Sequence, residues 1–236
     1  MRAFSQRASP VPQEYPMSET PLRISAVVLA AGLSSRMQGQ HKMMLPIGDE
    51  PAIRRTVRAV LAAGVHELVV VTGYQGREVL KAVLDLDVTV QPNLRYEEGQ
   101  MTSVAAGVAA LAKPTDAIMV CLGDLVLTTA EDYRALMDVY TARSNYSIVT
   151  PRYQGERGNP IVFAASYAPE VAAGRKLIGC RKLIEDYPDE NWFHDVNHDR
   201  YSVDLDTPED YARVLQRLGL GAAVAVATAA ETALVV

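Results

Sequence analysis

A cluster of small and cationic residues follows a short apolar run near residue 30, and together they could hold a polyanion. The run begins at Ile24, and the chain then contains, in order, Leu29, Ala30, Ala31, Gly32, Ser34, Arg36 and Lys42. Small side chains let an anionic ligand approach the backbone N–H groups. The guanidinium and the ammonium supply the positive charge that a triphosphate needs. The segment therefore predicts a loop that binds a nucleoside triphosphate.

This segment matches neither of the two commonest phosphate-binding motifs. It lacks the Gly-Lys-Ser/Thr ending of a Walker loop, and it lacks the Gly-x-Gly-x-x-Gly turn of dinucleotide-binding proteins. We interpret it as a triphosphate loop of a third type. The alternative is an ordinary strand-to-loop turn that carries basic residues by chance.

A carboxylate follows a second apolar run. Residues 117–122 read AIMVCL, and Gly123 and Asp124 come directly after them. A carboxylate at the end of a buried strand is well placed to hold Mg²⁺ against phosphate oxygens. A turn or helix-capping aspartate is the alternative, but the loop at Gly32 favours the metal.

Alternating strands and helices must position these side chains. The patterns predict strands over 24–29, 67–72, 87–91 and 117–122, and helices over 51–63, 77–84, 98–112 and 129–142. This alternation is typical of parallel strands with right-handed crossovers, which place ligands at the carboxyl ends of the strands. Gly32, Gly73 and the loop after Gln91 should meet there. The expected fold is a Rossmann-like three-layer α/β sandwich with a mostly parallel central sheet.

The second half of the chain is expected to continue the same architecture. The patterns predict a strand over 147–150, a turn into a strand over 155–163, an amphipathic basic helix over 174–187 and a last strand over 201–205. A helix over 208–217 should follow, capped by Asp206 or Thr207. Gly99 and Ser103 lie at the start of the helix expected at 98, where free N–H groups can meet a ligand, although simple capping explains Ser103 equally well.

Composition limits the classes of function. The formal net charge of −5 over 236 residues argues against a general nucleic-acid-binding surface. Cys121 and Cys180 are too few for a disulfide framework, so a reducing compartment, the cytoplasm, is expected. We predict a disordered lead-in over 1–22, a single domain over 23–218 and an Ala- and Val-rich tail over 219–236, with no membrane span.

The first motif also resembles that of a known family. Leu29 begins the sequence Leu-Ala-Ala-Gly-x-Ser-x-Arg-Met, which is followed by Lys42 and by Leu45-Pro46. This pattern resembles the signature of nucleotidyltransferases that act on the molybdenum cofactor, and its Leu-Ala-Ala-Gly form resembles the cytidylyltransferases among them. The resemblance extends over residues 24–216. It implies a fold of the nucleotidyltransferase and nucleotide-diphospho-sugar transferase type, Mg²⁺, CTP as donor and molybdopterin as acceptor, with a molybdoenzyme or chaperone as a plausible partner.

The resemblance also implies roles for individual residues. Lys42 and Arg36 would be catalytic and would also bind the nucleotide. The family aspartate before Thr-Pro-Glu-Asp reaches the metal, which implies that Asp206, or Asp204 on the same side of the chain, joins Asp124. Gly99 and Ser103 correspond to a segment that touches the base and ribose. Gly158 and Asn159 correspond to a segment beside the acceptor. Val126 departs from the family, which usually has proline there.

Three other functions stay open from the sequence. The first is cytidylyl or uridylyl transfer to a sugar phosphate or a polyol phosphate. The second is a nicotinamide-dependent oxidoreductase on a similar sheet, which the missing Gly-x-Gly-x-x-Gly argues against. The third is a carrier that binds the pterin without chemistry, which the joint presence of Lys42, Asp124 and Asp206 argues against.

Overall fold

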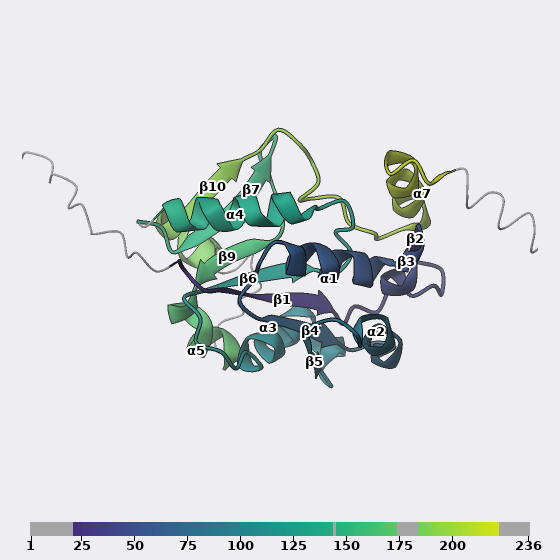
Figure 1. The fold of residues 1–236 in the computed structure, drawn as a ribbon, viewed down its shortest axis with the longest axis horizontal. Coiled ribbons are helices and arrows are strands. Elements are labelled where there is room, and N and C mark those ends of the chain that lie inside the picture. Colours follow the sequence, from purple (N-terminus) through teal and green to yellow (C-terminus); the bar gives the residue numbers. More distant parts are fainter. Residues whose placement is uncertain (1–20, 144, 174–183, 222–236) are drawn as a thin grey trace, which may run out of the picture.

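A single mixed sheet forms the middle of the protein, with helices on both of its faces (Figure 1). The computed structural model describes residues 21–143, 145–173 and 184–221. The main sheet has the strand order β10-β7-β9-β6-β1-β4-β5, with β8 paired to β7. Strands β1, β4, β5 and β6 are parallel to their neighbours in this group, whereas β9 is antiparallel to β6 and β7. The predicted fold class is confirmed.

The strands of the main sheet have these bounds: β1 Ile24–Ala30, β4 Leu68–Thr72, β5 Thr89–Pro92, β6 Ala117–Leu122, β7 Ile148–Tyr153, β8 Glu156–Arg157, β9 Ile161–Ala164 and β10 Asn191–Asp195. A small hairpin joins β2 Pro46–Ile47 to β3 Glu50–Pro51. The helices are α1 Ala52–Ala62, α2 Gly76–Val83, α3 Gln100–Ala109, α4 Ala130–Ala142, α5 Ala168–Ala172 and α7 Pro208–Arg217. Short 3-10 turns include η1 Lys42–Met44 and η2 Tyr96–Glu98.

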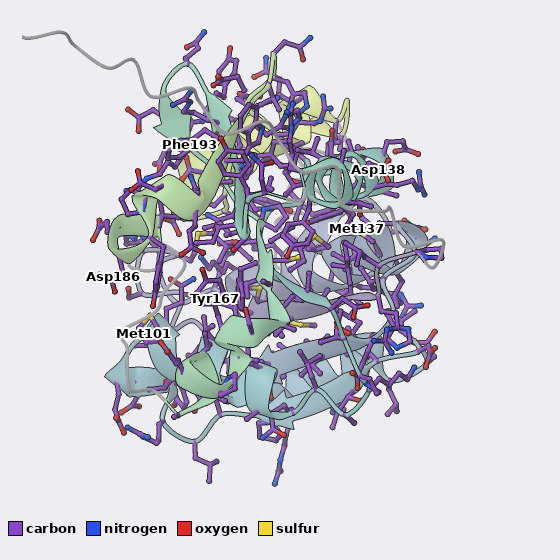
Figure 2. The ribbon with its side chains drawn as sticks, turned by 90° about the vertical axis from the view of Figure 1, so that its left-hand side faces the viewer. Met101, Met137, Asp138, Tyr167, Asp186 and Phe193 are labelled. Atoms are coloured by element: carbon purple, nitrogen blue, oxygen red, sulfur yellow. The ribbon has the colours of Figure 1, made fainter. Side chains whose placement is uncertain are left out.

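Two apolar cores explain why the strands read as nearly continuous hydrophobic runs. Alternate residues of β1 point to opposite faces, so Val28 lies in the core with α1, α2 and α4, and Val27 lies in the core with α3 and α5. Figure 2 shows the same division, with Met137 on one side of the sheet and Met101 and Tyr167 on the other. The two layers hold the sheet from both faces.

Helix α3 lies very close to the sheet because Gly107 has no side chain. A Cβ atom at Gly107 would be 2.3 Å from Cγ1 of Val27 and 2.8 Å from Cγ2 of Val71. These distances leave no space for a methyl group. The close approach brings the start of α3 to the carboxyl ends of β1 and β4.

The predicted last strand is wrong. Residues Tyr201 to Leu205 form no strand, and the edge strand is β10, which pairs in parallel with β7. The 201–205 backbone instead makes a contact with a turn, because the N–H of Asn159 donates to the carbonyl oxygen of Tyr201 at 2.7 Å. The apolar residues that alternate over 201–205 therefore do not indicate a strand here. Tyr201 and Leu205 are buried and anchor an irregular segment.

Most other predicted elements are confirmed within a few residues, and α3 ends at Ala109 rather than at 112. Thr129 and Thr207 each form a capping box with the aspartate three residues later, and Thr207 is one of the two caps expected for the last helix. Residues 1–20 of the lead-in predicted over 1–22, most of the basic helix at 174–187, Cys180 and most of the tail lie outside the described residues. Across the described ranges, none of the helices combines the length and apolar character needed to cross a bilayer.

Candidate functional site

A cavity of about 300 Å³ opens at the carboxyl ends of the central strands. It is lined by Leu29, Ala31, Gly32, Arg36, Lys42, Met43, Tyr96, Gln100, Ser103, Leu122, Asp124, Asp204 and Asp206. The parallel arrangement of β1, β4 and β6 creates this edge, because each strand ends there and passes into a loop. The loops therefore bring residues from distant parts of the sequence to one place.

The loop after β1 folds back so that Lys42 enters the cavity. Ser34 adopts a left-handed backbone conformation with φ of 55°, and its Oγ accepts a hydrogen bond from the backbone N–H of Lys42 at 3.1 Å. Met37 is buried beneath the loop, in a small core that also contains Leu205 and Val214. The loop backbone is thus held from both sides.

Lys42 is ion-paired with two aspartates. Its Nζ lies 2.5 Å from Oδ2 of Asp124 and 3.0 Å from Oδ1 of Asp206, and 15% of its side chain is exposed. Burial alone lowers the pKa of Lys42, but the charges and hydrogen bonds of Asp124 and Asp206 outweigh burial and raise that pKa. The side chain is therefore held as an ammonium.

Arg36 contacts the other oxygen of the same aspartate. Its guanidinium lies 2.6 Å from Oδ2 of Asp206, and 68% of the Arg36 side chain is exposed to solvent. Asp206 is consequently shared between a buried ammonium and an exposed guanidinium. Both cations that the sequence assigned to phosphates are engaged with carboxylates in this structure.

A third carboxylate completes an acidic group, which we call the aspartate trio: Asp124, Asp204 and Asp206. One oxygen of each lies within 4.8 Å of the others. Burial, followed by the charges of Asp124 and Asp206, raises the pKa of Asp204. Carboxylate oxygens are the donors that hard divalent cations prefer, so the trio fits a cation such as Mg²⁺. The sequence left a choice between Asp204 and Asp206, and both lie here.

The segment 198–206, which we call the C-terminal arm, carries two members of the trio. Arg200 makes two hydrogen bonds to the buried carboxylate of Asp132, at 2.6 and 2.5 Å, and the hydroxyl of Tyr201 donates to the backbone oxygen of Asp132. Leu205 is fully buried between Asp204 and Asp206. The arm is thus fastened to the start of α4, which itself follows Asp124.

The two residues predicted to face the acceptor lie beneath this arm. A Cβ atom at Gly158 would be 2.7 Å from the carbonyl oxygen of Tyr201, and Asn159 donates its N–H to the same oxygen. Gly158 and Asn159 are not among the described residues that line the cavity. They support the C-terminal arm instead.

Tyr96 lines the same cavity from the loop after β5. A Cβ atom at Gly73 would be 2.7 Å from Cβ and Cγ of Tyr96 and 2.9 Å from Cβ of Ala31, so a glycine is needed where these residues meet. The buried amide of Asn93 donates to Thr102 and Ser103 at 2.9 Å and fixes the start of α3. These contacts position Tyr96 and the start of α3.

The structure brings most of the predicted residues together. Leu29, Ala31, Gly32, Arg36, Lys42, Ser103, Asp124 and Asp206 line the cavity. Ala30 is buried behind it, Gly73 supports Tyr96, and Gly99 precedes α3 with φ of 114°. Sequence reasoning missed Tyr96 and Gln100. Neither residue belongs to a recognisable motif in the sequence.

Val126, where the family usually has proline, lies in the loop that follows Asp124. It is 1% exposed, and its carbonyl oxygen accepts a hydrogen bond from Nε of Arg55 at 2.9 Å. The bond joins this loop to α1. Arg55 therefore supports the loop that positions Asp124.

Comparison with known proteins agrees with this geometry. A family model described as the MobA-like NTP transferase domain matches residues 26–192. Bifunctional protein GlmU of Rhizorhabdus wittichii is 30% identical over 188 residues, which cover 77% of this chain and 37% of that protein. GlmU of Geobacillus sp. is 33% identical over 121 residues, which cover 50% of this chain and 25% of that protein. The chain thus spans less than two-fifths of the length of these relatives.

Two solved structures resemble the fold over most of their length. A nucleotidyl transferase from Methanothermobacter thermautotroptrophicus (Mth528) has a TM-score of 0.70 at 26% identity, covering 83% of this chain and 97% of that chain. Rv0371c from Mycobacterium tuberculosis H37Rv has a TM-score of 0.68 at 26% identity, covering 84% of this chain and all of that chain, 100%. The similarity therefore extends over most of this chain and nearly all of each neighbour.

Proposed function

The chain belongs to the family of MobA-like NTP transferase domains, and from this premise we propose that it transfers CMP from CTP to molybdopterin that carries molybdenum. The product would be molybdopterin cytosine dinucleotide, with release of pyrophosphate. The observation that supports this proposal is the convergence of the aspartate trio, Lys42 and Arg36 on one cavity at the carboxyl ends of β1, β4 and β6. The choice of CTP depends on the Leu-Ala-Ala-Gly sequence that begins at Leu29.

The chemistry requires orientation and charge neutralisation more than proton transfer. An acceptor phosphate oxygen attacks the α-phosphorus of the nucleotide, the bond from the α-phosphorus to the bridging oxygen breaks, and pyrophosphate leaves with the bonding electrons. The nucleophile is already an anion, so no general base is needed. Lys42 would stabilise the phosphoryl group in transfer and Arg36 the departing pyrophosphate. A divalent cation held by the trio would supply further neutralisation of charge between the reacting phosphates.

A sugar phosphate or polyol phosphate is the second candidate for the acceptor. This candidate is supported by the position of Gly158 and Asn159, which lie under the C-terminal arm rather than along the cavity. Gly158 and Asn159, to which the resemblance assigns the pterin contact, therefore do not account for it from the wall of this cavity. The reaction class is the same for both acceptors, but the donor to a sugar phosphate or polyol phosphate would be CTP or UTP, so the acceptor and the donor must be tested separately.

Thermal shift with a set of nucleotides tests the donor. CTP, GTP, UTP, ATP and NADPH are each added with Mg²⁺, and a ligand that binds the native state alone raises the melting temperature. CTP should give the largest rise. A rise with NADPH and none with a nucleoside triphosphate would contradict transferase chemistry. Pyrophosphate release is then measured with CTP and either molybdopterin or a sugar phosphate.

Removal of Lys42 tests the catalytic assignment. Lys42→Ala should lower turnover by more than about a hundredfold, the scale of losing one preorganised donor to the transition state. Pyrophosphate release is the measurement, with circular dichroism to verify folding. Lys81→Ala is the matched control, because Lys81 is exposed on α2 and should leave turnover unchanged. Near-normal turnover in pure, folded Lys42→Ala protein would refute the role.

A further inference from the structure

The two cations expected to meet the triphosphate are both held by the residues expected to hold the metal. Lys42 bridges Asp124 and Asp206, and Arg36 contacts the second oxygen of Asp206. We propose that the Lys42 ammonium and a divalent cation compete for Asp124 and Asp206, so that binding of the cation releases Lys42 towards the triphosphate. The first half concerns the free protein alone, and the second half rests on the proposed function.

Geometry makes the two occupants mutually exclusive. The Nζ atom is within hydrogen-bonding distance of one oxygen from each of two trio members, at 2.5 and 3.0 Å. A Mg²⁺ ion binds carboxylate oxygens at about 2.0–2.1 Å and requires near-octahedral geometry. An ammonium between the same oxygens would take its place and would repel it as a like charge. A cation that binds through these two oxygens therefore displaces the ammonium from them.

The side chain of Lys42 can move although its backbone is fixed. The hydrogen bond from Lys42 N–H to Ser34 Oγ and the 3-10 turn η1 hold the backbone. Ahead of the side chain is Gly32, where an added Cβ would lie 4.0 Å from Cε of Lys42, its nearest neighbour outside the adjoining residues. A lysine has a flexible four-carbon stem with a compact terminal charge. The ammonium can therefore swing from the carboxylates to a phosphate without any change in the loop.

The charge of the site explains why the exchange of Lys42 for a divalent cation couples binding of the cation to binding of the triphosphate. The trio contributes three carboxylates and faces one ammonium and one guanidinium, so the free site favours a cation over a triphosphate. A divalent cation reverses this balance and also frees Lys42. By thermodynamic linkage, the triphosphate must then favour binding of the cation by the same factor. Lys42 would be the residue that transmits this coupling.

Metal binding to the free protein tests the competition without nucleotide or acceptor. We would titrate Mn²⁺ and measure its dissociation constant by electron paramagnetic resonance for wild type, Lys42→Met and Arg36→Met. Lys42→Met should bind Mn²⁺ about tenfold more tightly, because a charge-assisted contact no longer has to be broken first. Arg36→Met is the matched control. It removes one positive charge from the same Asp206, yet its side chain is 68% exposed, so binding should tighten by less than about threefold.

Two results would overturn the proposal. Unchanged or weaker Mn²⁺ binding in Lys42→Met would show that Lys42 does not compete. An equal gain in both variants would show that general electrostatics, rather than exchange at Lys42, sets the affinity.

A second measurement uses the wild-type protein, so it does not depend on folding of a variant. The chain has five lysines, and acetic anhydride labels each according to its exposure and charge state. Mg²⁺ alone should increase the acetylation rate of Lys42 about threefold relative to exposed Lys81, measured by mass spectrometry, because the released amine is more exposed to the reagent than in its contacts with Asp124 and Asp206. An unchanged ratio would overturn the proposal.

The outcomes separate this proposal from the function on which its second half rests. If competition is observed but no acceptor gives pyrophosphate, the proposed function fails and the competition stands. If pyrophosphate is released while the Mn²⁺ affinities and the labelling ratio do not change as expected, the competition fails and the function stands.

Discussion

At the scale of single residues, the cavity depends on where side chains are absent as much as on where charges are present. Gly73 lets Tyr96 lie against Ala31, and Gly32 leaves space beside Lys42. The cationic residues and Asp124 could be identified from sequence because their chemistry is visible in their type. Tyr96 and Gln100 could not, since their position depends on how the loop after β5 folds over the sheet.

Gly73 offers a direct test of the cavity wall. Gly73→Ala places a methyl group 2.7 Å from Tyr96 and 2.9 Å from Ala31, so Tyr96 must shift. We expect the dissociation constant for Mg·CTP to rise about tenfold, which corresponds to about 1.4 kcal/mol. Isothermal titration calorimetry measures this. Gly221→Ala is the control, because its added methyl would meet no neighbour closer than 3.7 Å. Equal affinity in both variants would show that Tyr96 is not part of the nucleotide site.

At the scale of elements, the C-terminal arm shows what a sequence pattern can and cannot specify. The alternation over 201–205 predicted a strand, and it correctly placed Asp204 and Asp206 on the same side. The predicted strand is wrong because no neighbouring strand pairs with the arm. Its backbone is held instead by the turn at Asn159, and its side chains by Asp132. Helices with capping signals, such as α4 and α7, were predictable because their ends are set by local hydrogen bonds.

The ion pair between Arg200 and Asp132 should control both the stability of the arm and its affinity for metal. Arg200→Met removes the guanidinium that makes two hydrogen bonds to the buried carboxylate of Asp132, so the free energy of unfolding at pH 7 should fall by about 2 kcal/mol. Mn²⁺ affinity should fall as well, because the arm carries Asp204 and Asp206. Urea denaturation measures the first effect and Mn²⁺ titration the second.

The contribution of this pair should disappear in acid. Burial raises the pKa of Asp132, but the hydrogen bonds from Arg200 and Thr129 outweigh it, so the folded-state pKa lies below the usual 3.8. A depressed carboxyl pKa contributes stability above 3.8 that is lost as the pH falls below it. The difference between wild type and Arg200→Met should therefore shrink below pH 3.8. Arg217→Met, which breaks an exposed pair with Asp199, should change stability by less than about 0.5 kcal/mol. A pH-independent difference would contradict the assignment.

At the scale of the whole molecule, the site joins parts of the chain that meet only in the folded protein. Lys42 is 82 residues from Asp124 and 164 from Asp206, and the two cores hold the intervening elements in place. The parallel architecture was predictable because buried strands alternate with helices. The antiparallel β9 and the edge position of β10 were not, because short apolar strands carry no signal of their direction.

Ligand binding should consequently stabilise the entire fold. Mg·CTP at about 100 times its dissociation constant should raise the free energy of unfolding by about 2.7 kcal/mol, since no partly unfolded chain retains the site. Urea denaturation should show a higher midpoint with an unchanged slope, because the surface exposed on unfolding is the same. Asp124→Asn should lose most of this gain. A changed slope would indicate that part of the chain unfolds separately from the site.

The long separation between Lys42 and Asp206 also has a consequence during synthesis. On the ribosome, Lys42 and Asp124 emerge well before Asp206 is translated, so an early intermediate can form the first ion pair but not the second. Such a nascent chain has neither the trio nor the C-terminal arm that completes the cavity. Translation order therefore postpones completion of the cavity until Asp206 has been synthesised and has left the ribosome.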